Sequence, residues 1–284
     1  MLFRSRAGLW RLMVNETVSD TTEAGVDKQA YLRRAVGRDM DVEWVDINIW
    51  RRQSVLASSY GRGRVFLAGD AVHQLSPTGA LGMNTGIGDA VDLGWKLAAV
   101  LQGWGGATLL ASYDAERRPV GKRAVDSATG FHNAQTGWGD GLDRLAEASE
   151  AGAALRARIG AILVGNVGRE FRTFGLQLGY RYEASPICAP EAGAPPPDDP
   201  ETYRPSARPG MRAPHVWLSR DVSILDCFGR GFTLLDFGGD AGPIKRAAVA
   251  AGVPLQAVSI DSAEARDLYA CTLALVRPDG HVAW

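Results

Sequence analysis

The sequence has little cysteine, no surplus of charge of either sign and no long apolar run. Its three cysteines, Cys188, Cys227 and Cys271, form no CxxC pair, which excludes a locally encoded zinc site or dithiol redox centre and fits a reducing cytoplasm. The 31 basic and 32 acidic residues leave a net charge of -1, too small to attract nucleic acid or an anionic membrane. No segment has the apolar length of a membrane span, and the first residues lack the pattern of a signal peptide. We therefore expect a cytoplasmic protein that acts on a small molecule, with no nucleic-acid or membrane partner.

The first part of the chain predicts a sheet and a short helix. Loose apolar alternation over residues 1–18 and 42–58 predicts two strands of one antiparallel sheet. Residues 27–38 begin with an acidic residue and end with basic ones, as the helix dipole favours, and predict a short helix. Residues 64–68, RVFLA, form the short continuous apolar run that is typical of a buried central strand.

Three helices are expected after this strand. Apolar residues near helical spacing predict the first at residues 83–101. Residues 109–128, with a kink near Pro119, and residues 142–162, which are rich in alanine, leucine and arginine, predict the other two. In the first of them, Asp89, Asp92 and Lys96 are expected to form the polar, solvent-facing side.

The last third of the chain changes character. Seven prolines precede Pro209 within residues 185–209, which predicts an extended linker. Beyond it, four short apolar runs alternate with two helical segments and end in a PDGH turn, as expected of a small α/β domain. The sequence thus predicts an α/β protein in four parts: 1–60, 61–184, 185–209 and 210–284.

Glycines interrupt the passage from strand to helix over residues 69–98, GDAVHQLSPTGALGMNTGIGDAVDLGWKLA. Each glycine inside a helix costs about 1 kcal/mol relative to alanine, so we expect the backbone there to approach something closely. Asp70, at the carboxyl edge of the strand, can accept hydrogen bonds from the hydroxyls of a ribose or polyol. The free amides of a helix that begins near residues 82–84 suit a negative charge or an electron-rich ring edge. The pattern predicts a ligand site at this passage.

The segment RVFLAGDAVHQLSPTGALGMNTGIGDAVDLGWKLAAVL resembles the second FAD-binding motif of the flavin-dependent aromatic hydroxylases, which include the para-hydroxybenzoate, phenol and polyketide hydroxylases. FRSRAGLWRLMV, VDINIWRRQSVLASSYGRG and LGYRY resemble other segments of the same enzymes. The resemblance makes residues 1–60 a remnant of an antiparallel substrate-binding sheet, 61–184 a partial FAD-binding domain with its second motif and helices, and 210–284 a thioredoxin-like domain.

The resemblance implies an FAD-dependent monooxygenase that hydroxylates a phenolic or polyketide ring with O₂, while NAD(P)H reduces the flavin. It assigns seven residues to cofactor binding. Asp70, with Gly69 beside it, would bind the ribityl chain of FAD, and Pro77 and Gly79 would lie along the flavin face. Gly82, Met83 and Asn84 would face the pyrimidine edge of the flavin. It implies no catalytic nucleophile and no metal. We interpret His73 as a packed histidine without a catalytic part.

One part of the family pattern is missing. No GxGxxG occurs before residue 64, although the family begins with that motif, whose helix holds the FAD pyrophosphate. The expectation is a C-terminal portion of such an enzyme, with an exposed apolar sheet edge. The alternatives to a stand-alone hydroxylase are an inactive fragment, a half that associates with a separate nucleotide-binding half, and a non-hydroxylating flavoprotein. Apart from such a half, the partner expected is a second copy of the chain in a homodimer.

Overall fold

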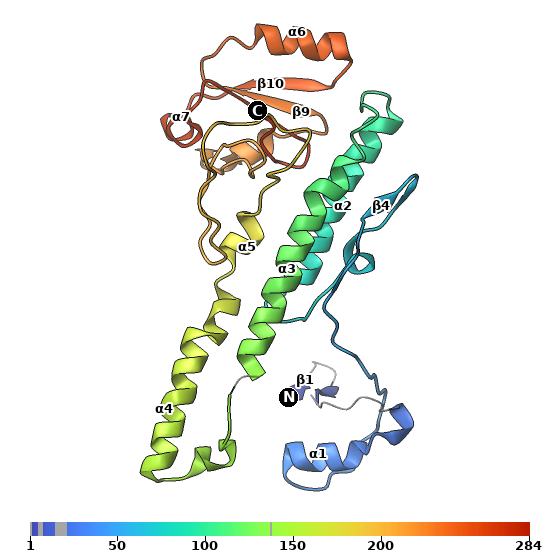
Figure 1. Ribbon diagram of the computed structural model, residues 1–284, viewed down its shortest axis with the longest axis vertical. Coiled ribbons are helices and arrows are strands. Elements are labelled where there is room, and N and C mark those ends of the chain that lie inside the picture. The colour runs from blue at the N-terminus through green and yellow to red at the C-terminus, as the bar shows by residue number, and fades with distance from the viewer. Residues whose placement is uncertain (1, 5–7, 15–21, 137) are drawn as a thin grey trace. The chain divides into compact units, whose positions relative to one another are not determined.

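The computed structural model describes residues 2–4, 8–14, 22–136 and 138–284 (Figure 1). The chain divides into two compact units, residues 1–52 and 53–284, and its helices and strands make a mixed α/β protein. The four-part domain division expected from the sequence stays a prediction. Within the described residues, no helix combines the length and apolar character needed to cross a membrane.

The first unit contains one short strand pair and one α-helix. Its elements are the antiparallel strands β1 (Leu2–Arg4) and β2 (Trp10–Leu12), the 3-10 helix η1 (Glu23–Gly25) and the helix α1 (Lys28–Val36). Asp27 caps α1 by accepting a hydrogen bond from the Ala30 amide at 2.9 Å. Gly37 ends the helix with a φ of +83°, a left-handed conformation that suits glycine. The short helix predicted over residues 27–38 is therefore confirmed.

The predicted strand over residues 42–58 is wrong for most of its length. Its one strand is β3 (Val55–Leu56), which pairs antiparallel with β6 (His73–Gln74) of the second unit. Val45, within the predicted strand, is 74% exposed, and no described strand pairs with residues 42–54. Alternation alone does not make a strand when no neighbour supplies hydrogen bonds. Residues 5–7 and 15–18 of the other predicted strand lie outside the described residues.

The prediction of a buried central strand at residues 64–68 is also wrong. β5 (Val65–Phe66) forms a hairpin with β4 (Gly61–Arg62), and no other described strand pairs with it. Val65 is 65% exposed, and Leu67 is exposed as well. Val65 and Leu67 therefore lie at the surface, while Phe66 between them packs against Tyr113 of α3.

Helices fill the middle of the second unit. They are α2 (Leu81–Leu101), α3 (Ser112–Thr136), η3 (Leu142–Ala146), α4 (Glu150–Gly165), η4 (Val167–Phe171) and α5 (Phe174–Leu178). α2 and α3 lie side by side as an antiparallel pair (Figure 1). All three predicted helices are present, although the third begins later than expected, where Ser149 Oγ caps α4 by accepting from the Gly152 amide at 3.1 Å.

The end of the chain forms a three-stranded sheet with its own core. The strands lie in the order β10 (Leu255–Ser259), β9 (Phe232–Asp236) and β11 (Leu273–Val276), with β10 parallel and β11 antiparallel to β9. The other elements are β7 (Trp217–Ser219), β8 (Val222–Ser223), η5 (Ile224–Cys227), α6 (Gly242–Ala251) and α7 (Ala263–Tyr269). Both predicted helical segments are confirmed, and the PDGH turn closes through a hydrogen bond from the Gly280 amide to the Arg277 carbonyl at 2.9 Å.

Candidate functional site

The predicted ribityl-binding residues form a tight turn beside α2. Residues Gly69–Ala71 make the 3-10 turn η2, and Gly69 has a φ of +59°, which favours glycine. The side chain of Asp70 is exposed, and no described residue pairs with its carboxylate. A Cβ added to Gly86 would lie 3.2 Å from the Cα of Gly69, so the absence of a side chain at residue 86 lets the turn lie directly against α2.

The other predicted cofactor residues lie at the start of α2. The Pro77 carbonyl accepts from the Ala80 amide at 3.1 Å, and Ala80 then adopts a φ of +53°, which is unusual for a residue other than glycine. No described side chain caps this helix end. The amides of Leu81, Gly82 and Met83 therefore have no partner within the helix, whereas the Asn84 amide is the first that reaches a carbonyl four residues earlier, that of Ala80.

The structure requires glycine for different reasons at different positions of this passage. Gly79 has a φ of +84°, and a Cβ on it would lie 2.8 Å from Phe131 Cδ2. A Cβ on Gly88 would lie 2.7 Å from Arg117 Nη2, so this glycine makes room for the buried guanidinium. The expectation of close packing is wrong at Gly94, where an added Cβ would meet no described atom within 4 Å.

The packing of α2 reverses the expected arrangement of its faces. Asp89, Asp92 and Lys96 are fully buried, whereas they were expected to face solvent. The apolar residues Met83 and Ile87 are 75% and 54% exposed. Charged groups can be buried in this way only when they are paired, and α3 and the end of the chain supply the partners.

The first buried cluster ties the Gly69 turn to α2 and α3. Asp89 Oδ2 accepts from the Gly69 amide at 3.1 Å and from His73 Nε2 at 2.9 Å, while Oδ1 accepts from Arg117 Nε at 2.8 Å. Arg117 Nη2 also donates to the Thr85 carbonyl at 3.0 Å. Burial raises the pKa of Asp89, but the hydrogen bonds from His73 and Arg117 outweigh burial and hold it below its usual range. Asp89 is therefore an ionised carboxylate with donors on both oxygens.

His73 is a fully buried histidine whose Nε2 faces Asp89. Its Nδ1 has no partner among the described residues, and its ring contacts no open surface. The interpretation of His73 as a packed histidine agrees with this placement. Sequence reasoning missed the roles of Asp89 and Arg117, because helical spacing alone does not reveal which charged side chains find buried partners.

The second buried cluster joins α2 and α3 to the end of the chain. Arg277 donates to Glu116 Oε1 at 2.6 Å, to Asp92 Oδ1 at 2.9 Å and to Asp279 Oδ2 at 2.6 Å. Lys96 Nζ donates to Asp92 Oδ2 at 2.7 Å and to Glu116 Oε2 at 2.5 Å. All five side chains are at most 2% exposed. Three acidic groups therefore meet two basic ones without solvent.

Burial and the excess of one acidic group favour the protonated form of Asp92. Burial raises the pKa of Asp92 to about 8, and the neighbouring Glu116 carboxylate adds to the effect against the opposing Lys96 ammonium. Burial also acts on Asp279, but the Arg277 guanidinium holds the pKa of that carboxyl well below its usual range. With Asp92 protonated, the two remaining carboxylates balance Lys96 and Arg277.

The proton on Asp92 makes stability depend on pH. Because the folded-state pKa lies above the unfolded value, the stabilisation is present in acid and is lost as the pH rises through the folded pKa of about 8. We expect the free energy of unfolding to fall from near pH 4 towards pH 8 in the unsubstituted chain relative to Asp92→Asn. Urea unfolding of both proteins across this range measures the difference. If the free energy of unfolding of the unsubstituted chain minus that of Asp92→Asn rises with pH, or does not change, the raised pKa of Asp92 is contradicted.

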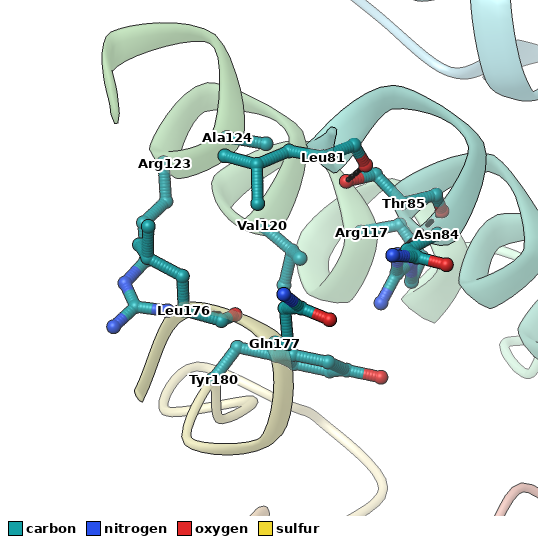
Figure 2. Close-up of a pocket in the computed structure, with 10 residues that line it drawn as sticks. All are labelled: Leu81, Asn84, Thr85, Arg117, Val120, Arg123, Ala124, Leu176, Gln177 and Tyr180. Carbon is teal, nitrogen blue, oxygen red and sulfur yellow. Dashed lines mark hydrogen bonds between the residues drawn. The ribbon is translucent and has the colours of Figure 1, made fainter. Parts of the chain in front are cut away.

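A small cavity lies between α2, α3 and the residues around α5 (Figure 2). Its volume is about 40 Å³, and its lining includes Asn84, Thr85, Arg117 and Tyr180. A space of this size suits one or a few water molecules and is too small for an aromatic ring. Of the predicted residues, Asn84 alone lines it, while Asp70, Pro77 and Met83 are exposed, and their binding of the cofactor stays a prediction. Among the described residues, no group of three His, Cys, Asp or Glu side chains could hold a metal ion.

Two families of known proteins match the chain. The FAD binding domain family matches residues 5–128, and the family of the C-terminal part of aromatic-ring hydroxylases matches residues 206–284. The chain is 41% identical over 252 residues to the FAD-dependent monooxygenase apdD of Emericella nidulans, covering 83% of this chain and 40% of that protein. It is 37% identical over 278 residues to a putative polyketide hydroxylase of Streptomyces halstedii, covering 89% of this chain and 46% of that protein.

A solved structure supports the same relationship. RebC, an enzyme of rebeccamycin biosynthesis solved with reduced flavin, superposes with a TM-score of 0.84 at 43% identity, covering 98% of this chain and 51% of RebC. The chain thus spans about half the length of the proteins it matches, or somewhat less. The family matches and these similarities agree with the resemblance read from residues 64–101, and the chain belongs to the family of flavin-dependent aromatic hydroxylases.

Proposed function

We propose that this chain contributes to the FAD-dependent hydroxylation of a phenolic or polyketide ring by O₂, with NAD(P)H as the reductant. The observation that carries the proposal is the exposed turn at Gly69–Ala71 beside the uncapped start of α2. The match of residues 5–128 to the FAD binding domain family and the similarity to FAD-dependent monooxygenases support it.

The residues at this place suit one end of FAD. The Asp70 carboxylate is exposed and has no described partner, so it can accept hydrogen bonds from ribityl hydroxyls. The free amides at Gly82 and Met83 and the positive end of the α2 dipole would stabilise negative charge at the pyrimidine edge of the flavin. Bound FAD would supply the redox and oxygen chemistry.

The chain's own part in the reaction is binding and orientation. Asp70 would fix the ribityl chain, Pro77 and Gly79 would lie along the face of the flavin, and the amides around Met83 would hold its polar edge. These backbone donors are already in place at the end of a rigid helix, so they need no reorganisation when charge develops. No side chain is proposed as a nucleophile.

Replacing Asp70 tests the proposal directly. We expect Asp70→Asn to weaken FAD binding by roughly tenfold or more, because a hydrogen bond to a charged group contributes about 1.5–3 kcal/mol. Flavin fluorescence titration measures the dissociation constant, and the purified chain with bound FAD should absorb at about 450 nm. Asp126→Asn is the control, since Asp126 is exposed on α3 and pairs with Lys122. Equal affinities of the two variants would contradict the role of Asp70.

A second candidate function is that of a half-protein that needs a nucleotide-binding partner. The exposed apolar side of α2, with Met83, Ile87 and Val91, favours it, because such patches mark interaction surfaces. In this case the chain alone would form aggregates or bind FAD poorly. A monomer in size-exclusion chromatography that binds FAD stoichiometrically would count against it.

Further features of the sequence belong to the same proposal. We propose that residues 210–284 form a thioredoxin-like domain without dithiol chemistry, since Cys227 and Cys271 form no CxxC pair and both thiols are free. The sparse cysteines support a cytoplasmic location. A homodimer is the partner proposed if the chain does not need a nucleotide-binding half.

A further inference from the structure

The turn that carries Asp70 packs against Gly86 of α2, and the Val72 carbonyl that follows it accepts from the Ala57 amide at 2.7 Å, but few hydrogen bonds hold the turn itself. Within the turn, the Val72 amide donates to the Gly69 carbonyl at 2.9 Å, and the Ala71 amide donates to the Ala68 carbonyl at 3.3 Å. These bonds shape the turn but do not attach it to α2. Its first residue is attached to α2 by the hydrogen bond from the Gly69 amide to Asp89 Oδ2 at 3.1 Å.

Asp89 is itself held rigidly. Arg117 binds its second oxygen, and the same guanidinium is fixed by the Thr85 carbonyl at 3.0 Å and by the Tyr182 hydroxyl at 3.3 Å. Rotating the carboxylate would separate it from a buried guanidinium, which is costly because both charges lie out of water. The position of the Gly69 amide is thus determined by α2 and α3 together.

Asp89 lies on the inner side of the turn, and Asp70 lies on the outer side. Asp89 is fully buried, whereas the side chain of Asp70 is exposed. A ligand bound by Asp70 would therefore not touch Asp89. A change at Asp89 would instead move the backbone of the residue that precedes Asp70.

We propose that Asp89 is a positioning residue for cofactor binding, which holds the Gly69 amide and so directs the Asp70 carboxylate towards the ribityl chain. The inference rests on the proposed function, because it takes Asp70 to be a ligand of FAD. His73 and Arg117 complete the arrangement by occupying the remaining acceptor sites of the carboxylate. Each donor comes from a different element, so the cluster couples the turn to the helix pair.

The test compares Asp89→Asn with Asp92→Asn. Asp92 lies on the same helix, is equally buried and does not contact the turn. We expect Asp89→Asn to speed amide hydrogen exchange at residues 69–72 by about tenfold without flavin, because Arg117 draws the remaining oxygen and leaves an amide group facing the Gly69 amide. We also expect the FAD dissociation constant to rise about tenfold, and Asp92→Asn to change neither.

A second variant covers the case in which Asp89→Asn does not fold. Asp89→Leu/Arg117→Met removes both buried charges, so no unpaired guanidinium remains, and it still deprives the Gly69 amide of its acceptor. Unchanged exchange at residues 69–72 in a folded variant would overturn the proposal. So would faster exchange with unchanged FAD affinity, provided that Asp70→Asn weakens binding. If Asp70→Asn binds FAD as well as the unsubstituted chain does, the proposed function fails, and the exchange measurement alone still decides whether Asp89 holds the turn.

Discussion

Arg277→Met should lower the free energy of unfolding by about 3–5 kcal/mol, the usual cost of removing one member of a buried ion cluster. Arg277 donates to three buried carboxyl groups, those of Asp92, Glu116 and Asp279. Its guanidinium also lies 5.3 Å from the ring centre of Trp95. Methionine fills much of the same space but leaves Lys96 as the one charged partner of Glu116 in this cluster and removes the guanidinium from Asp279, so the loss is mainly electrostatic.

The matched control is Arg266→Met. Arg266 pairs with Asp261 at 2.7 Å, but both side chains are exposed, and an exposed pair contributes at most about 1 kcal/mol. Urea unfolding followed by far-UV circular dichroism gives both free energies. If the two variants lose similar amounts, the buried cluster does not hold the end of the chain to α2 and α3 in the way that the geometry indicates.

The second large effect is expected for Gly88→Ala, with an opposite effect for Gly94→Ala. A methyl group on Gly88 would lie 2.7 Å from Arg117 Nη2 and 3.1 Å from its Cζ. The guanidinium cannot shift without losing its bond to Asp89, so we expect a loss of about 1–3 kcal/mol, as for other overpacked sites. Gly94 lies on the same helix with open space at its Cα, and alanine there should raise the free energy of unfolding by about 0.5–1 kcal/mol.

Thermal and urea unfolding of the two alanine variants provide the comparison. Because both changes add the same methyl group to one helix, the difference in their effects isolates the contact with Arg117. Equal stabilisation by both alanines would mean that Arg117 moves aside at no cost. That result would contradict the claim that Asp89 and Arg117 hold each other rigidly, on which the positioning of the Gly69 turn depends.

Local patterns predicted the helices well and the strands poorly. The segments that became α1, α2, α6 and α7 have helical spacing or end signals within their own length, since each helix makes its backbone hydrogen bonds internally. The strand expected at residues 64–68 shares its hydrogen bonds with a neighbour that lies elsewhere. Its apolar run therefore could not reveal whether it would be central and buried or, as found, one arm of an exposed hairpin.

The glycine-rich stretch indicated correctly where the backbone bends and approaches other atoms, but it did not indicate which atoms it approaches. Gly69 and Gly79 have positive φ values, which glycine allows at little cost. The close approach at Gly86 was expected, but the partner at Gly88 turned out to be the side chain of Arg117. The sequence shows that residue 88 has no side chain, but only the packing of α3 shows that the Arg117 guanidinium occupies the space beside it.

The sequence by itself determined the family, the segment where the cofactor residues are expected and the positions of most helices, because each depends on residues that are close together in the chain. Only the tertiary structure decided that Asp89, Asp92 and Lys96 lie inside while Met83 and Ile87 lie outside. The partners that make this arrangement favourable, Arg117 and Arg277, come from α3 and from the turn after β11. A buried charge is stabilised by whichever group it meets in the fold, and no local pattern around residues 89–96 specifies that group.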